Sequence, residues 1–235
     1  MEIKGFIDIS FVDWDSKISS VIFLSGCNFR CPFCHNVNLV INSENLETIP
    51  FEDIEKQLKK QKGWGEGVCI TGGEPTLQSS LPELCFRIKK MGFLVKLDTN
   101  GTNPTMLKEL MKRKLLDYVA MDIKAPLTTE KYSKAIGVDA EQLLEKVKES
   151  IGILLHSSID YEFRTTVVPT IHDVCDVKQI CRSLKECKKY VLQKFDVSIG
   201  KTVIDPDFLT KTLSEEEMQK FLVAAQEVIP NTKRR

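Results

Sequence analysis

The 235-residue sequence has no excess of charge, because 33 basic side chains balance 33 acidic ones. It lacks the basic surplus that favours binding to nucleic acid or to an anionic membrane. No apolar run reaches about 18 residues, so no segment is predicted to span a bilayer. Residues 1–5 lack the basic and then apolar pattern of a signal peptide. We expect a soluble, cytoplasmic protein without a nucleic-acid or membrane partner.

The chain also lacks an internal repeat and any linker rich in Pro, Gly or Ser. A charged fraction of 28% and an apolar fraction of 42% exclude collagen-like and wholly disordered classes. Its length suits one domain with its own core. We therefore expect a single domain over residues 1–235, with a core at about 18–195 and a C-terminal helical extension at about 205–235.

Short β-rich runs alternate with segments of helical periodicity about six times, which predicts an α/β fold with parallel strands and helices outside. An open doubly wound sheet and a partial (β/α) barrel both fit, since six units are too few for a complete barrel. In both, ligands bind at the carboxyl ends of the strands. The basic residues 233–235 are predicted to be a solvated tail. The expected strands are 18–25, 67–71, 93–97, 117–122, 160–168 and 189–194, and the expected helices are 51–61, 81–91, 104–114, 139–151, 173–186 and 214–228.

Three of the eight cysteines follow the first expected strand at the spacing Cys-x3-Cys-x2-Cys: Cys27, Cys31 and Cys34. Without an export signal, reduced thiols are the better expectation. Iron–sulfur electron carriers use four thiolates, so three would leave one iron of a 4Fe–4S cluster open to a chelating molecule. The alternatives are a zinc site completed by His35 and a redox pair of Cys31 and Cys34. The other five cysteines are expected to be inert, buried side chains.

Further polar motifs follow later strands. Gly72 and Gly73 end one strand, where the absence of side chains lets the backbone approach a ligand closely. Asp98 and Asp122 end the next two strands, so their carboxylates can face one cavity. Asp122 and Lys124 stand two apart in an extended stretch and share a face. The alternatives are an ordinary Gly-Gly turn and solvated cap residues.

Together these motifs resemble the radical S-adenosylmethionine (SAM) enzymes, and among them the glycyl-radical-enzyme activases. In residues 35–36, 74–78 and 162–169, the sequence most resembles that of the activating proteins of anaerobic ribonucleoside-triphosphate reductase. The resemblance covers about residues 5–195. It implies a partial (β/α)6 barrel, a 4Fe–4S cluster on the three cysteines, and SAM chelated to the fourth iron. It also implies a glycyl radical enzyme as protein substrate, anaerobic ribonucleotide reductase above all, and a flavodoxin- or ferredoxin-type electron donor.

The resemblance also implies roles for single residues. Gly72 and Gly73 would bind the amino group of SAM with support from Glu74, and Lys124 with Asp122 would meet its carboxylate. Asp98, Asp122 and the backbone of Thr99 would hold a monovalent cation. Three further residues have more than one possible role. Phe33 would lie near the adenine or belong to the loop core, and His35 would contact SAM through its backbone. Arg164 would contact SAM or substrate, or be a solvated side chain.

Two other functions stay open at this point. A 7-carboxy-7-deazaguanine synthase is a small radical SAM enzyme acting on a pterin, but it typically continues Cys-Asp-Thr after the cluster, where this chain has Cys34, His35 and Asn36. A zinc-binding interaction module would not need Asp98, Asp122 or Lys124 at strand ends.

Overall fold

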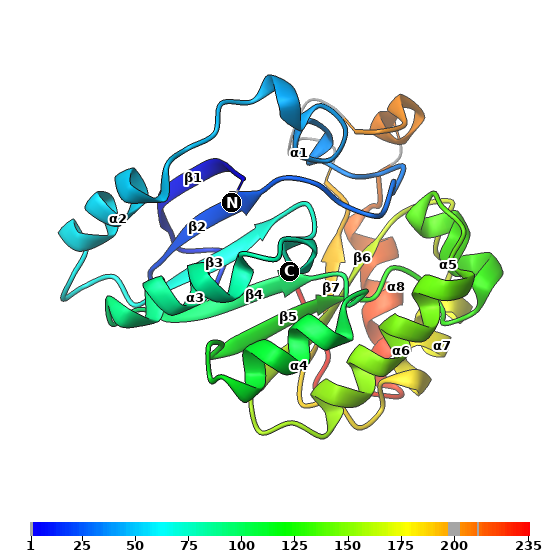
Figure 1. Cartoon of the computed structure of the whole chain (residues 1–235). Helices are drawn as coiled ribbons and strands as arrows, with labels where there is room; N and C mark the ends of the chain where they lie inside the picture. The colour runs from blue at the N-terminus through cyan, green and yellow to red at the C-terminus, as the bar shows by residue number, and fades with distance from the viewer. Residues whose placement is uncertain (1, 197–202, 211) are drawn as a thin grey trace. The chain divides into compact units, whose positions relative to one another are not determined.

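The computed structural model describes residues 2–196, 203–210 and 212–235. Strands and helices alternate along them, and the strands belong to one sheet in which they follow each other in chain order, from β1 to β8. The predicted α/β class with parallel strands is therefore confirmed (Figure 1). The strands are β1 (Ile3–Ser10), β2 (Ser19–Leu24), β3 (Gly67–Gly72), β4 (Leu94–Thr99), β5 (Tyr118–Asp122), β6 (Asp160–Val167), β7 (Tyr190–Lys194) and β8 (Lys233–Arg234).

Eight α-helices and three short 3-10 helices connect these strands within the described residues. The α-helices are α1 (Val37–Val40), α2 (Phe51–Lys60), α3 (Leu81–Lys90), α4 (Pro104–Lys112), α5 (Thr129–Ile136), α6 (Glu141–Leu155), α7 (Val174–Ser183) and α8 (Glu215–Gln226). The 3-10 helices are η1 (Ser43–Asn45), η2 (Pro75–Leu77) and η3 (Pro206–Thr210). None of the helices in the described part of the chain has the length and apolar character needed to cross a membrane.

Contacts between residues divide the chain into two compact units, which we describe separately. The first comprises Met1–Asn28, Asn38–Thr99 and Thr105–Ala120, and the second comprises Phe29–Val37, Asn100–Pro104 and Met121–Arg235.

In the first unit, β1 runs antiparallel to β2, while β2, β3 and β4 are mutually parallel. The register pairs Leu24 at the end of β2 with Gly72 at the end of β3. This pairing places the start of the cysteine loop beside the Gly-Gly turn, because both follow the carboxyl ends of neighbouring strands. Strands β2 and β3 are buried along most of their length, as expected of a covered parallel sheet.

Helices α2 and α3 cover this part of the sheet with amphipathic faces. Helix α2 buries Phe51, Ile54 and Leu58, which recur at the spacing of one helical face. Arg87 of α3 links the two helices, because its guanidinium lies over the Phe51 ring and 3.0 Å from Glu55.

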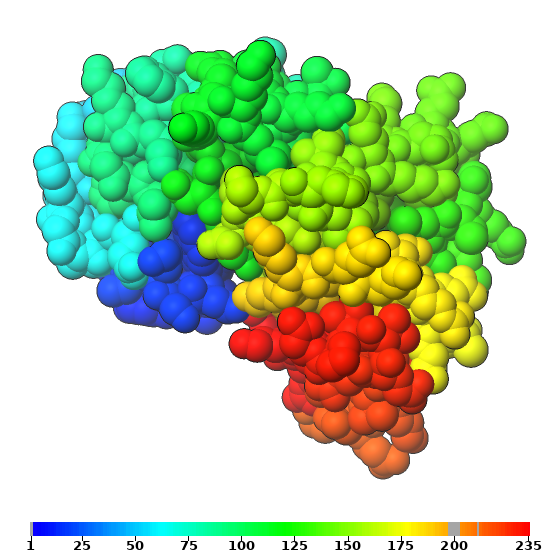
Figure 2. All heavy atoms as spheres, turned by 90° about the horizontal axis from the view of Figure 1, so that it is seen from below, coloured from blue at the N-terminus to red at the C-terminus, as the bar shows by residue number. Residues whose placement is uncertain are grey.

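In the second unit, β6, β7 and β8 are parallel. Helices α7 and α8 both begin with capping boxes, closed by Asp173 with Asp176 and by Ser214 with Glu217. The two helices pack side by side, drawn in yellow and red in Figure 2. All twelve expected strands and helices occur, within a few residues of their expected bounds.

Two expectations were wrong. Residues 233–235 are not a solvated tail, since β8 pairs with β7 and the Arg235 guanidinium lies 3.0 Å from the buried Glu162 carboxylate. Cys175 is exposed on α7, whereas Cys69, Cys85, Cys181 and Cys187 are buried as expected.

Candidate active site

The turn after β3 packs directly on the backbone that enters the cysteine loop. Gly73 N–H donates to the carbonyl of Leu24 (2.9 Å), and Glu74 N–H donates to that of Gly26 (2.7 Å). A Cβ atom on Gly73 would lie 1.9 Å from the Gly26 carbonyl oxygen, and one on Gly72, whose φ is +116°, would lie 2.4 Å from that of Leu24. Glycine at both positions is thus required for this close approach. The turn thereby fixes the residue that precedes Cys27.

Glu74 is fully buried and ties the ends of two strands together. Its Oε1 accepts hydrogen bonds from the Thr76 backbone N–H (3.1 Å), the Thr76 hydroxyl (2.5 Å) and the Thr99 hydroxyl (2.7 Å). The carboxylate therefore links the segment that follows the Gly-Gly turn to the end of β4.

Asp98 has a cationic neighbour on its own strand that the sequence analysis missed. The Lys96 ammonium lies 3.0 Å from Asp98 Oδ1 and donates to the carbonyl of Asp13. Its side chain is 2% exposed. The i, i+2 spacing of Lys96 and Asp98 in a strand was the signal that could have revealed the pair.

In the second unit, Cys31 and Cys34 belong to one turn, in which Cys34 N–H donates to the Cys31 carbonyl (2.9 Å). Backbone hydrogen bonds hold this segment at both ends, from Arg30 N–H to Ile136 (2.7 Å) and from Asp205 N–H to Pro32 (2.8 Å). Burial raises the pKa of the Cys34 thiol, and the Asn36 amide, Lys124 and Arg30 oppose that rise.

Asp122 lies between two cations at the end of β5. Lys124 Nζ is 3.0 Å from one of its carboxylate oxygens, and Arg164 Nε is 3.0 Å from the other. Burial alone would raise the pKa of Asp122, but Arg164 and Lys124 outweigh it and lower that pKa to about 2. The pKa of Lys124 is raised, against the effect of burial, by Asp122 and by the thiols of Cys31 and Cys34.

The backbone carrying Asp122 and Lys124 is anchored by side chains of the following strands. The Ile123 carbonyl accepts from the Thr165 hydroxyl (2.9 Å), which in turn accepts from the Tyr190 hydroxyl (2.8 Å). The Lys124 carbonyl lies 2.8 Å from Nε2 of His172. Sequence reasoning did not assign a role to His172, whose position shortly after a strand was its only signal.

Phe33 and His35 lie in an aromatic cluster of the second unit. The Phe33 ring packs edge-on against Phe195 (6.2 Å) and near Phe208 (6.5 Å), while His35 stacks on Phe195 (5.1 Å). Burial lowers the pKa of His35. Phe33 is thus buried among aromatic rings, and Arg164 is also buried.

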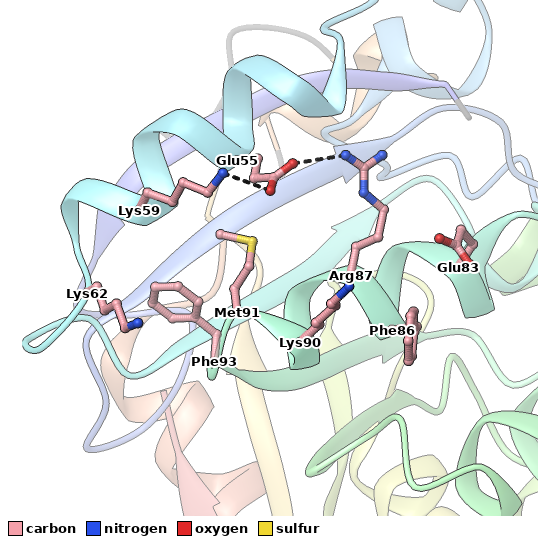
Figure 3. A pocket seen from close by; sticks show the side chains of 9 residues that line it. All are labelled: Glu55, Lys59, Lys62, Glu83, Phe86, Arg87, Lys90, Met91 and Phe93. Atoms are coloured by element: carbon pink, nitrogen blue, oxygen red, sulfur yellow. Dashed lines mark hydrogen bonds and ion pairs between the residues drawn. The ribbon is translucent and has the colours of Figure 1, made fainter.

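Two hollows lie in the first unit, and neither is lined by a predicted ligand residue. A groove of 580 Å³ lies between α2 and α3, with Glu55 bound to Lys59 and Arg87 at its rim (Figure 3). A smaller hollow of 410 Å³ is bordered by Ser25, Gly26 and Gln78. Across the described residues, no three His, Cys, Asp or Glu side chains are gathered as a metal site. The donor set of three thiols within eight residues nevertheless suits iron.

Residues 21–192 match the family model of the radical SAM superfamily. The chain is 34% identical, over 97% of its length and 93% of the relative's, to a Methanocaldococcus jannaschii protein named "Putative glycyl-radical enzyme activating enzyme MJ1227". A Saccharolobus islandicus protein named "Probable GTP 3',8-cyclase" is 36% identical over 133 residues, which cover 54% of this chain and 41% of the relative.

Among solved structures, the fold is similar to that of Streptococcus suis SuiB bound to S-adenosylmethionine, with a TM-score of 0.66 at 15% identity. The similarity covers 92% of this chain and 51% of the SuiB chain, so this chain spans about half of that neighbour. At this identity the likeness concerns the fold alone.

Proposed function

Because the chain belongs to the radical SAM superfamily, it is an enzyme with radical SAM chemistry, and we propose that it is a glycyl-radical-enzyme activase. The observation that carries this proposal is the 34% identity to the named activating enzyme over nearly the whole of both chains. We propose anaerobic ribonucleoside-triphosphate reductase as the protein substrate, because the sequences of residues 35–36, 74–78 and 162–169 resemble those of its activating proteins.

Cys27, Cys31 and Cys34 would hold a 4Fe–4S cluster, with SAM as the ligand of the fourth iron. When bound, these groups would supply reductive cleavage of the SAM sulfonium bond by one electron from a flavodoxin- or ferredoxin-type donor. The products would be methionine and a 5′-deoxyadenosyl radical that can take hydrogen from a glycine of the partner. The protein's part is to bind, orient and shield its cofactors.

The charges around Asp122 support a carboxylate ligand. Lys124 and Arg164 both contact this one carboxylate, so the three side chains carry a net charge of +1. An added carboxylate, such as that of SAM, would balance this charge, and Lys124 can bind it while Arg164 keeps Asp122 ionised. Arg164 would thus affect SAM binding indirectly, because it keeps Asp122 ionised.

The Gly72–Gly73 turn supports a second contact to SAM. Its backbone is held by hydrogen bonds from Gly73 N–H to Leu24 and from Glu74 N–H to Gly26. A rigid turn can bind the amino group of SAM through its backbone carbonyls, at little entropic cost. We assign Phe33 and His35 to the wall of the SAM site, held in place by Phe195.

The decisive experiment mixes the anaerobically reconstituted, reduced protein with SAM and the oxygen-free reductase. We expect 5′-deoxyadenosine together with a doublet glycyl radical signal in electron paramagnetic resonance. A Gly→Ala change at the reductase's radical site should abolish the doublet and serves as the matched control.

Parallel reactions test the other substrates. With 6-carboxytetrahydropterin or with GTP in place of the reductase, we expect no product other than the slow cleavage of SAM itself. Conversion of either small molecule, without a doublet on the reductase, would replace the activase by a small-molecule enzyme. A colourless protein that binds zinc but no iron would remove radical chemistry altogether.

A further inference from the structure

The family resemblance implies a monovalent cation held by Asp98, Asp122 and the backbone of Thr99. Such a site needs carboxylates whose charge is still available to an ion. The residues present do not fit this requirement, because each of the two carboxylates already has a cation of the protein against it.

Lys96 supplies that cation to Asp98 within the first unit. Its ammonium forms an ion pair with Asp98 Oδ1 at 3.0 Å, without the geometry of a hydrogen bond, and a hydrogen bond to the Asp13 carbonyl fixes its position. The side chain is 2% exposed, and a buried ammonium is retained only where it is paired and hydrogen-bonded. Leu97 is fully buried on the opposite face of β4. Because neighbouring side chains of a strand point to opposite faces, the packing of Leu97 keeps Lys96 on the same face as Asp98.

Asp122 is balanced independently within the second unit. Lys124 and Arg164 each lie 3.0 Å from one of its carboxylate oxygens. A metal cation at this carboxylate would add a third positive charge to a group that already has two. An alkylammonium head, by contrast, has the single charge and roughly the size of a potassium ion, so Lys96 can serve Asp98 as a fixed substitute.

We propose that the Lys96 ammonium takes the place of the monovalent cation, so that this enzyme works without added potassium or sodium. Lys96 would act as a positioning residue, because it holds the Asp98 carboxylate rather than the reacting atoms. The activity test of this inference rests on the proposed function, whereas the ion-binding test does not.

The activity test measures 5′-deoxyadenosine formation by the reconstituted enzyme with tetramethylammonium as the only added cation. We expect the wild-type rate to stay within about twofold of the rate in potassium. Lys96→Met should lose about tenfold or more in tetramethylammonium, because it removes the ammonium beside the Asp98 carboxylate, and should regain rate with potassium or ammonium ions. Lys89→Met removes another ion-paired lysine of the same unit, whose partner Asp117 lies 2.7 Å away, and should create no potassium requirement.

The ion-binding test uses the protein without SAM. The wild-type protein should broaden the sodium-23 NMR line no more than a protein of equal net charge does. The Lys96→Met protein should broaden the line further. Should Lys96→Met fail to fold, Lys96→Met/Asp98→Asn removes both charges and should fold without binding sodium, and the wild-type measurement still decides.

The outcomes separate the two proposals. A wild-type enzyme that cleaves SAM only with potassium or sodium, or that binds sodium specifically, overturns the substitution by Lys96 and leaves the activase intact. An absence of SAM cleavage in every salt overturns the activase, and the sodium measurement then still tests Lys96.

Discussion

His172 and Lys124 are joined across 48 residues by a hydrogen bond of 2.8 Å between the imidazole Nε2 and the Lys124 carbonyl. The other ring nitrogen, Nδ1, accepts from the Val168 backbone N–H (3.0 Å). Because Nδ1 is an acceptor, the proton must be on Nε2, and the ring is neutral. A charged imidazolium would lose the bond to Val168, so this brace depends on the protonation state of His172.

We predict that the protein loses stability below pH 6.5 in part through His172. Burial lowers the pKa of His172 from its usual 6.5, so its contribution is complete above that value and is lost as the pH falls through the lowered pKa. Urea unfolding of the cluster-free protein at several pH values should show a shallower slope for His172→Gln than for wild type. The slope should not vanish, since burial lowers the pKa of His35 as well. The matched control is His156→Gln on the exposed end of α6, and equal slopes in His172→Gln and wild type would refute the assignment.

Lys124→Ala should keep the cluster but weaken SAM binding. A charged donor bound to a carboxylate contributes about 1.5–3 kcal/mol, which corresponds to about a 10- to 150-fold loss of affinity. Titration of the cluster's paramagnetic signal with SAM measures the change. Lys131→Ala removes an ion pair with Asp176 in the same unit and should leave the titration unchanged. An unaltered titration in Lys124→Ala would take Lys124 out of the site.

Replacement of Cys27, Cys31 or Cys34 by Ala should each abolish stable iron binding, because two thiolates cannot hold four irons firmly. The control is Cys175→Ala, which removes an exposed thiol at little cost to the core. Iron content and absorbance near about 400 nm, typical of thiolate-bound clusters, measure the result after anaerobic reconstitution. Full iron content in Cys31→Ala would contradict the three-thiolate assignment.

Gly73→Ala should destabilise the fold by about 3 kcal/mol or more, since its Cβ has no space beside the Gly26 backbone. Iron incorporation should fall with it, because the displaced segment leads into Cys27. Gly152→Ala in α6 meets nothing within 4 Å and should instead stabilise the protein by about 0.5–1 kcal/mol. Urea unfolding compares the two, and a neutral Gly73→Ala would show that the turn can move aside.

The sequence predicted those parts of the fold that depend on local patterns. Helix α3 has apolar residues at helical spacing and Gly92 as its stop signal, so it was found within one residue at its end. Strand β1 was missed because its antiparallel pairing with β2 depends on a long-range contact, although its β-rich composition was visible. Strand β8 was missed for the same reason, since Lys233 and Arg234 have no apolar pattern of their own.

The same difference between local patterns and long-range contacts applies to the site residues. Motifs placed after strands indicated Gly72, Gly73 and Asp122, because strand ends can be located from sequence. The i, i+2 spacing also indicated Lys124 beside Asp122, but partners on other strands and loops could not be predicted. The spacing of Lys96 and Asp98 on one strand could have revealed that pair, whereas His172 reaches Lys124 only through the fold of the β6–α7 connection. Charge pairing across strands depends on register, which composition does not contain.

The pairing of β8 with β7 has a consequence for aggregation. Arg235 N–H donates to the Leu192 carbonyl (2.9 Å), and Lys194 N–H donates to the Arg235 carbonyl (3.2 Å), so the last residues cover the hydrogen-bonding edge of β7. Cleavage before residue 233 would expose that edge and remove a guanidinium from the buried Glu162 carboxylate. An uncovered apolar edge strand is a template for pairing with other chains. Proteolytic trimming at this end is therefore expected to increase self-association of the protein, even though no residue of the proposed SAM site is lost.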